Sequence, residues 1–401
     1  MANTTTGGSE TKISKSIQKF LTARPVFRKL ASFAENNTLV KGTSVNRPYR
    51  NDFFGYASDY TANTDVTAKD WTVTASNLSI DQSKAVSIKV DPVENKQLQT
   101  ANAEVLFAKR LSETLIDLMD KDFLDEVSNA ALSVDAGDLG GTSGSPITVG
   151  TTAEVEAIFG RARSKILSNT DEEVGMYAVI DPYLIDQIAI RGIAQGYNLA
   201  DSYFKNGFVG SMFAGMDVYS SNKLPSTVDF TIANAIPAAG DTITLTTGIT
   251  FPFQTTLGTT AGNVLSEVSE TQTAANLVAA INGAAGAGTK YVEPSPTVRD
   301  RIKRLGIAAT SSAGVVTITS YGRLLTSVNF ATTANGVFGD QTLSCMVGQY
   351  GAIDMVAQME PHVQINKATN NLGSTYLAHA LWGTKTFEDG AQRLLKLSIK
   401  G

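Results

Sequence analysis

Apolar and polar residues alternate along residues 71–91, near the end of the first quarter of the chain. Val86, Ile88 and Val90 are each separated by one polar residue, and a similar rhythm precedes them from Trp71 onwards. A period of two is typical of a strand whose side chains point alternately to two faces. The polar sequence DQSK separates the two runs. The pattern therefore predicts a β-hairpin over residues 71–91.

This predicted hairpin has few apolar residues to bury, and no third strand is evident beside it. Isolated two-stranded hairpins are only marginally stable in water. We therefore expect the hairpin to rest on another molecule, and a second copy of this chain is the simplest candidate.

A helical period follows directly. Phe107, Leu111, Leu115 and Leu118 recur at spacings of three and four residues within residues 98–132, which predicts one long helix. About 35 residues at a rise of 1.5 Å per residue would span about 50 Å. Because a typical helix has about 11 or 12 residues, this one is expected to act as a spine for the fold.

The N-terminal segment predicts two short amphipathic helices. The first has Ile13, Ile17, Phe20 and Leu21 on one face, and the second covers residues 27–34. Two interpretations have equal weight: these helices pack on their own chain, or they contact a neighbouring subunit or an acidic partner.

Residues 151–225 have α/β character. They predict an amphipathic helix over 153–166, a buried strand over 176–180, and a helix that Asp181 caps and Pro182 begins. A further strand and its exit are expected over 215–225.

The composition changes over residues 226–330, which are rich in Thr, Ala and Gly and carry six acidic and six basic residues. A hairpin over 241–253, a helix and a further pair of strands are expected there. About 105 residues with their own core candidates suggest a separate, inserted domain that folds alone.

Long strands return after this segment, over residues 345–359 and 374–400, and the second stretch is expected to form a pair that turns at residues 388–390. Apolar residues lie on both predicted faces around Trp382, so we expect the spine helix to cover this strand.

Composition and charge limit the function. The 401 residues are 42% hydrophobic and 18% charged, as in ordinary soluble domains, and the net charge is −5. This charge argues against a chain that binds nucleic acid over its whole surface. Residues 1–50 nevertheless carry nine basic and two acidic residues, a net charge of +7, so the remainder carries −12.

The sequence offers little for catalysis. Two histidines, His362 and His379, and the single Cys345 lack the spacing of a metal or nucleophile motif, and strand-face histidines are the expected alternative. The acidic run over 117–126 is expected to be a solvated or subunit-facing surface, and the glycine-rich loop over 135–150 lacks the lysine of a phosphate-binding loop. We therefore predict no catalytic, cofactor-binding or metal-binding residue, and no enzyme.

The sequence also indicates the cellular compartment in which the chain folds. A lone cysteine excludes an intrachain disulfide and fits a reducing cytoplasm. The chain begins without the pattern of a secretion signal, and it has no apolar run long enough to span a bilayer. We therefore expect a protein that is neither exported by such a signal nor embedded in a membrane.

Taken in order, these features resemble the major capsid proteins of tailed bacteriophages with the HK97 fold, in the P22-like branch that carries an inserted domain. The stretches AVSIKVDPVENKQLQ, YAVIDPYLIDQI and LAHALWGTKTFEDGAQRLLKL carry the resemblance. It implies an α+β fold with the following parts: an N-terminal arm (1–45), an E-loop (46–97), a P-domain with the spine helix (98–150), an A-domain (151–225), an insertion domain (226–330) and return strands of the A- and P-domains (331–401).

The resemblance also implies a function. Such a chain assembles into hexamers and pentamers of an icosahedral head shell that encloses the phage genome, is built in the host cytoplasm, and meets scaffold and portal proteins and packaged double-stranded DNA. In that family the E-loop lies on a neighbouring subunit. Expected contact residues between subunits are Trp71, Lys84, Ile88 and Lys89; expected arm residues facing the shell interior are Lys12, Lys15, Lys19 and Arg24.

Three alternatives stay open. An encapsulin-like nanocompartment would share the fold and enclose an enzyme, and the inserted segment argues for the virus instead. A surface adhesion module would explain the Thr/Gly-rich strands but lacks an export signal. An enzyme would need a pocket around His362 or His379.

Overall fold

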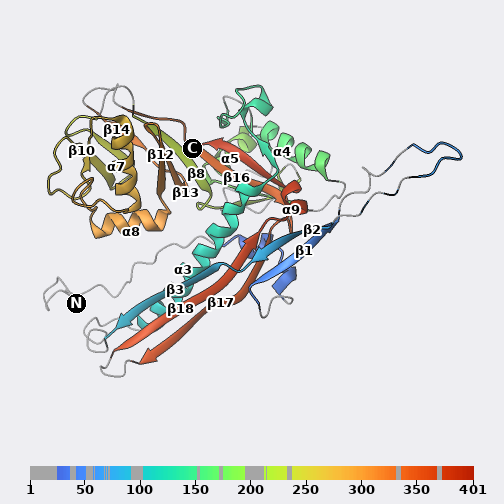
Figure 1. The fold of residues 1–401 in the computed structure, drawn as a ribbon, viewed down its shortest axis with the longest axis horizontal. Coiled ribbons are helices and arrows are strands. Elements are labelled where there is room, and N and C mark those ends of the chain that lie inside the picture. Colours follow the sequence, from blue (N-terminus) through green and yellow to red (C-terminus); the bar gives the residue numbers. More distant parts are fainter. Residues whose placement is uncertain are drawn as a thin grey trace. The chain divides into compact units, whose positions relative to one another are not determined.

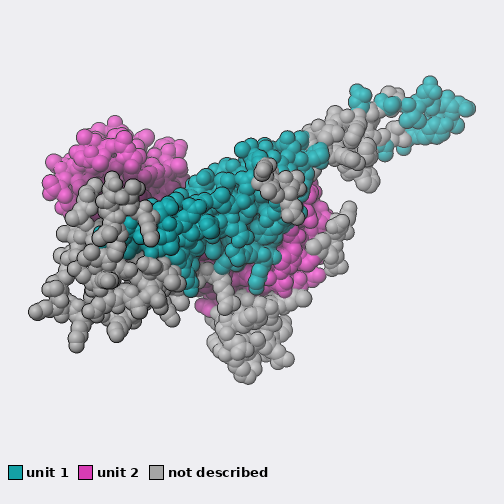
Figure 2. Space-filling view, turned by 90° about the horizontal axis from the view of Figure 1, so that it is seen from below, with its two compact units in different colours: residues 1–123, 353–387 teal, residues 124–352, 388–401 magenta. Residues whose placement is uncertain are grey.

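The computed structural model (Figure 1) divides into two compact units, which Figure 2 colours separately. Unit 1 comprises residues 1–123 and 353–387, and unit 2 comprises residues 124–352 and 388–401. The residues that the structure describes are 25–36, 42–50, 57, 59–66, 68, 70, 73–91, 103–150, 154–170, 175–194, 212–213, 215–232, 237–330, 336–367 and 373–401.

Unit 1 contains an antiparallel three-stranded sheet in the order β17 (Asp354–Lys367), β18 (Ser374–Lys385) and β3 (Gln82–Val90). These strands run side by side in Figure 1. Along β18, the apolar residues of one face are buried, whereas those of the other face are only partly buried. The buried face consists of Tyr376, Ala378, Ala380 and Trp382.

Helix α3 (Ala103–Asp125) covers this buried face, as the sequence predicts. Its Asp122 carboxylate accepts hydrogen bonds from Trp382 Nε1 at 3.0 Å and from Thr384 Oγ1 at 2.7 Å. A buried indole N–H needs such a partner. The helix and the sheet are therefore joined by these polar contacts.

The predicted hairpin over residues 71–91 is wrong in its pairing. Its two strands exist, as β2 (Val73–Ser79) and β3, but they do not pair with each other. Strand β2 pairs with β1 (Ser44–Arg50), and β3 pairs with β18 along its whole length. The partner of β3 lies almost 300 residues away along the chain and leaves no local signal, so the short polar link between β2 and β3 was mistaken for a hairpin turn.

The spine helix is shorter than predicted at its C-terminal end. Helix α3 has 23 residues, about 35 Å, and ends at Asp125. A 3-10 turn (Glu126–Asn129) and strand β4 (Leu132–Val134) replace the predicted last turns. Leu132 and Val134 pair with the C-terminal strand instead of continuing the helix.

The N-terminal helices are only partly within the described residues, which begin at residue 25. The second predicted helix is reduced to one turn, α1 (Phe27–Leu30), followed by a 3-10 turn (Ala34–Asn36). Phe27 and Leu30 are buried, so this part packs on its own chain. The first predicted helix lies outside the described residues.

Unit 2 has a ten-stranded sheet whose main path is β12-β13-β8-β16-β5-β7-β6, with β15, β19 and β4 paired beside it. Several predictions are confirmed here. The amphipathic helix is α4 (Val155–Asn169), the buried strand is β5 (Met176–Ile180), and Pro182 begins α5 (Pro182–Ala194). The remaining strands of the main path have these bounds: β6 (Met212–Phe213), β7 (Met216–Ser220), β8 (Pro225–Thr231), β12 (Ala308–Ser312), β13 (Val315–Tyr321) and β16 (Thr342–Gln349).

Residues 226–330 form the predicted elements. The hairpin is β9 (Thr242–Thr246) with β10 (Ile249–Gln254), the helix is α7 (Glu270–Asn282), and the later strand pair is β12 with β13. This segment has an apolar core of its own that includes Phe230, Phe251 and Leu277. Its β8 also pairs with β16, outside the segment. The other elements of this segment are β11 (Val264–Leu265), α8 (Pro296–Leu305) and β14 (Ser327–Asn329). Outside it, unit 2 also contains a 3-10 turn (Ala136–Leu139) and β15 (Val337–Phe338).

The expected strand pair that turns at residues 388–390 is also wrong. Helix α9 (Glu388–Gln392) occupies that position, and β18 and β19 (Leu394–Lys400) belong to different sheets. Strand β19 pairs with β16, whereas β18 pairs with β17 and β3. The single long strand expected over 345–359 is also wrong, because this stretch is divided between β16 and β17, which belong to different sheets.

Candidate assembly surfaces

Strand β3 is an edge strand of the unit 1 sheet. One of its sides pairs with β18, and no strand within the described part of the chain pairs with the other. Its predicted contact residues divide between two faces: Lys84 and Ile88 pair with Ala380 and Tyr376, on the face that α3 covers, and Lys89 lies on the opposite face. Both lysines are exposed and Ile88 is partly buried.

An open sheet edge can add a strand from another chain, and lysines on an edge weaken uncontrolled pairing. Lys84 and Lys89 therefore disfavour uncontrolled pairing at this edge. The other predicted contact residues lie outside the described part of the chain: Trp71, Lys12, Lys15, Lys19 and Arg24.

The connection between β1 and β2 carries exposed apolar side chains that no sequence pattern marks. Tyr60 is 69% exposed and Val66 is 67% exposed. Asn63 adopts a left-handed conformation with φ of 63° at a turn between them. Two large exposed apolar side chains in one loop make this loop a candidate for a contact with another molecule.

The base of the β1–β2 ribbon is fixed to the rest of unit 1 by Arg47. Its guanidinium lies 3.2 Å from Asp354 and 3.6 Å from Glu35, and 4.4 Å from the centre of the Phe387 ring. Leu78 of β2 is fully buried against Val356 and Phe387. The ribbon is therefore anchored within its own unit at one end, although its loop is exposed. Arg47 had no local signal because its partners are distant in sequence.

A buried carboxylate holds the start of the described chain. Asp120 of α3 is fully buried, and its Oδ1 accepts the backbone N–H groups of Val26 at 2.7 Å and Phe27 at 3.2 Å. The expectation that the acidic run over 117–126 is a solvated or subunit-facing surface is therefore wrong for Asp120. A buried carboxylate requires such donors, and they come from a segment more than 90 residues earlier.

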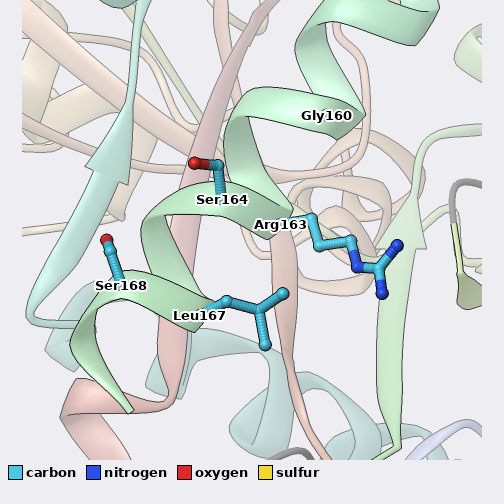
Figure 3. Close-up of a pocket in the computed structure, with 5 residues that line it drawn as sticks. All are labelled: Gly160, Arg163, Ser164, Leu167 and Ser168. Carbon is cyan, nitrogen blue, oxygen red and sulfur yellow. The ribbon is translucent and has the colours of Figure 1, made fainter. Parts of the chain in front are cut away.

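Helix α4 in unit 2 has a shallow hollow of about 610 Å³ along it. It is lined by Gly160, Arg163, Ser164, Leu167 and Ser168, whose spacing of three and four residues places them along one face of the helix. In Figure 3, Arg163 and Leu167 point to the right of the view and the two serines to the left. Within this lining the described side chains include no carboxylate, histidine or cysteine. The hollow can offer hydrogen bonds and one positive charge, and no acid–base pair.

The histidines and the cysteine that were considered for catalysis lie in strands. His362 in β17 lies directly opposite His379 in β18. Cys345 in β16 is fully buried, and burial raises the pKa of its thiol to about 12. Among the described residues no group of three or more His, Cys, Asp or Glu side chains is arranged to hold a metal ion.

In the described part of the chain no helix is both long and apolar enough to pass through a bilayer. No family model matches the chain, and no curated protein is similar to it in sequence.

The fold is nevertheless similar to solved structures from bacteriophages. A structure from Mycobacterium phage Che8 matches with a TM-score of 0.53 and 12% identity, covering 96% of this chain and 94% of the other. The capsid structure of the Cyanophage P-SCSP1u matches with a TM-score of 0.50 and 11% identity, covering 97% and 92%. The chain therefore has a mixed α+β fold similar to that of phage capsid structures, over nearly its whole length.

Proposed function

We propose that this chain is the major capsid protein of a tailed bacteriophage, which self-assembles into hexamers and pentamers of an icosahedral shell around the phage genome. The observation that carries the proposal is the similarity of fold, over 97% of this chain, to a chain of a cyanophage capsid. A fold alone does not specify a function.

The proposed finer architecture is the HK97 arrangement of N-terminal arm, E-loop, P-domain and A-domain, with residues 226–330 as an inserted domain. The E-loop corresponds to the exposed connection between β1 and β2. Its apolar residues Tyr60 and Val66 then lie on a neighbouring copy. The base of the ribbon, anchored at Arg47, sets the direction in which the loop extends from the rest of unit 1.

The proposed partners follow from charge and location. The arm residues Lys12, Lys15, Lys19 and Arg24 face the shell interior, where they meet a scaffold protein or packaged DNA. A portal protein occupies one vertex, and assembly takes place in the host cytoplasm. The protein is not an enzyme in this proposal.

Assembly is the decisive test. The purified chain is examined by sedimentation velocity and negative-stain electron microscopy over a concentration series, and closed shells or capsomers are expected. The double variant Tyr60→Ser/Val66→Ser should raise the concentration needed for assembly at least tenfold. Many weak contacts repeated around a shell amplify a small loss at each one.

The matched control is Val268→Ser in unit 2, where a valine is 91% exposed but far along the chain from the loop. This variant should assemble like the wild type if the loop is the contact. A chain that stays monomeric at every concentration and salt would contradict the proposed function. Equal effects of the two variants would contradict the role of the loop.

A second experiment tests the interior arm. Replacing its four basic residues by glutamine should leave shell formation intact and reduce the DNA recovered in shells from infected or reconstituted cells. Shells that hold a protein cargo and no DNA would instead favour the encapsulin-like alternative.

A further inference from the structure

Two histidines that are 17 residues apart in sequence are direct neighbours in the unit 1 sheet. The antiparallel register of β17 and β18 places His362 opposite His379. Directly opposite residues of an antiparallel pair project from the same face. Their ring centroids are 6.3 Å apart and the ring planes are nearly perpendicular, at 86°.

We propose that His362 and His379 together bind a divalent transition-metal ion of the Zn²⁺ class, bridging the two strands. Imidazole nitrogen is a preferred ligand of such ions. An ion midway between the rings would lie about 3 Å from each centroid, which matches a Zn–N bond of about 2.0–2.1 Å plus the roughly 1 Å from nitrogen to ring centre. Two imidazoles at this separation can hold one ion between them once a nitrogen of each ring is turned towards it.

The state of His379 supports a ligand at this position. Its Nδ1 atom is buried and has no hydrogen-bond partner among the described residues. Buried polar atoms in folded proteins are nearly always partnered, so an exception needs an explanation. An ion held by this nitrogen would use its lone pair. His362 is exposed, so the ion can enter from solvent.

The surroundings of the histidine pair indicate how tightly it would bind an ion. On the other side of His379 the register places Ala85 of β3, which is small and exposed. The described residues supply no third histidine, cysteine or carboxylate to the group. Two protein ligands with water in the remaining positions predict modest affinity and one ion per chain. Because β17 and β18 are both held by the ion, binding should stabilise unit 1.

The test is isothermal titration of the full-length chain with ZnCl₂, accompanied by thermal unfolding with and without the metal. We expect one ion per chain and a Zn²⁺-dependent rise in the unfolding temperature, because a ligand that binds the native state raises its stability. His362→Gln and His379→Gln should each weaken binding at least tenfold and abolish the rise. His362→Gln changes an exposed residue and should leave the circular dichroism spectrum unchanged.

A gain of binding provides the second measurement. Ala85→His places a third imidazole on the same face of the sheet, opposite His379, and should tighten Zn²⁺ binding at least tenfold. Cys345→Ser is the control for thiol binding and should bind like the wild type. The proposal is overturned if both glutamine variants retain wild-type affinity, if the wild type binds no ion, or if Ala85→His binds no more tightly than the wild type.

Discussion

Neighbouring carboxylates on α3 have different roles because they differ in burial. Glu113 is partly exposed and pairs with Arg110 at 2.8 Å on the surface of the helix. Asp120 is fully buried and accepts two backbone N–H groups. Asp122 accepts the indole N–H of Trp382. The sequence presents all three as similar acidic residues on one helix, and only the fold distinguishes them.

This difference leads to a prediction for Asp120. Asp120→Ala should lower the free energy of unfolding by about 1–3 kcal/mol, because two buried N–H groups would lose their acceptor. Glu113→Gln is the matched control on the same helix and should cost about 0.5 kcal/mol or less, as surface pairs do. Urea denaturation followed by circular dichroism measures both. Equal losses for the two variants would contradict the anchoring role of Asp120.

Asp138 gives a pH-dependent prediction. Burial alone would raise its pKa, but the Lys165 ammonium at 2.6 Å and the backbone N–H of Asp135 outweigh it and lower the pKa below its ordinary value of 3.8. A carboxylate whose pKa is lowered by folding stabilises the protein above the unfolded pKa, and this contribution is lost as the pH falls through 3.8 and below.

We therefore expect Asp138→Asn to be less stable than the wild type at pH 7, with a difference that shrinks as the pH falls from about 5 towards 3. Unfolding temperatures across this range measure the effect. Asp340→Asn removes a more exposed partner of Lys400, 2.7 Å away, and serves as the control with little change. A difference that is independent of pH would exclude the electrostatic explanation.

At the scale of elements, the sequence predicts what local patterns determine. The five inward residues of α4, from Val155 to Ile166, are all buried. All five residues of β5 are buried as well, as a continuous apolar run predicts. In both cases the period of the side chains within one element carries the information.

Pairing between elements was not predictable in the same way. A period of two identifies β2 and β3 as strands, but the partner of β3 is β18, whose own alternation begins near residue 374. The anchors Arg47 and Asp120 were missed for the same reason, since their contacts join distant segments. Lys84 and Ile88 of β3 share a face with Val86, whereas Lys89 lies on the opposite face. This division between the two faces follows from the alternation alone.

Two glycines test how tightly elements pack. A Cβ on Gly383 of β18 would lie 2.2 Å from the carbonyl oxygen of Ser79, so Gly383→Ala should destabilise the protein by about 1–3 kcal/mol. A Cβ on Gly160 of α4 would have no atom within 4 Å, and Gly160→Ala should stabilise it by about 0.5–1 kcal/mol because alanine favours a helix. Thermal unfolding would reveal shifts of opposite sign, and shifts of the same sign would contradict this packing.

At the scale of the whole molecule, charge is distributed unevenly along the chain. Residues 1–50 carry a net charge of +7 within a total of −5. The remaining −12 makes copies of the chain repel one another when many are brought together. The basic segment attracts acidic surfaces of the same or another copy. These two effects have opposite signs and are both screened by salt.

Which effect is larger determines how assembly depends on ionic strength. The screening length falls from about 30 Å at 0.01 M salt to about 10 Å at 0.1 M. Repulsion between the acidic parts of different copies acts over many charge pairs and long distances. Added salt therefore weakens this repulsion more than it weakens short contacts such as the pair of Arg47 with Asp354 at 3.2 Å.

We therefore expect assembly, followed by light scattering, to be faster near 0.1 M than near 0.01 M salt. Replacing Lys12, Lys15, Lys19 and Arg24 by glutamine makes the net charge more negative and should steepen this dependence. Assembly that is fastest at the lowest ionic strength would mean that attraction between the basic segment and the acidic remainder dominates.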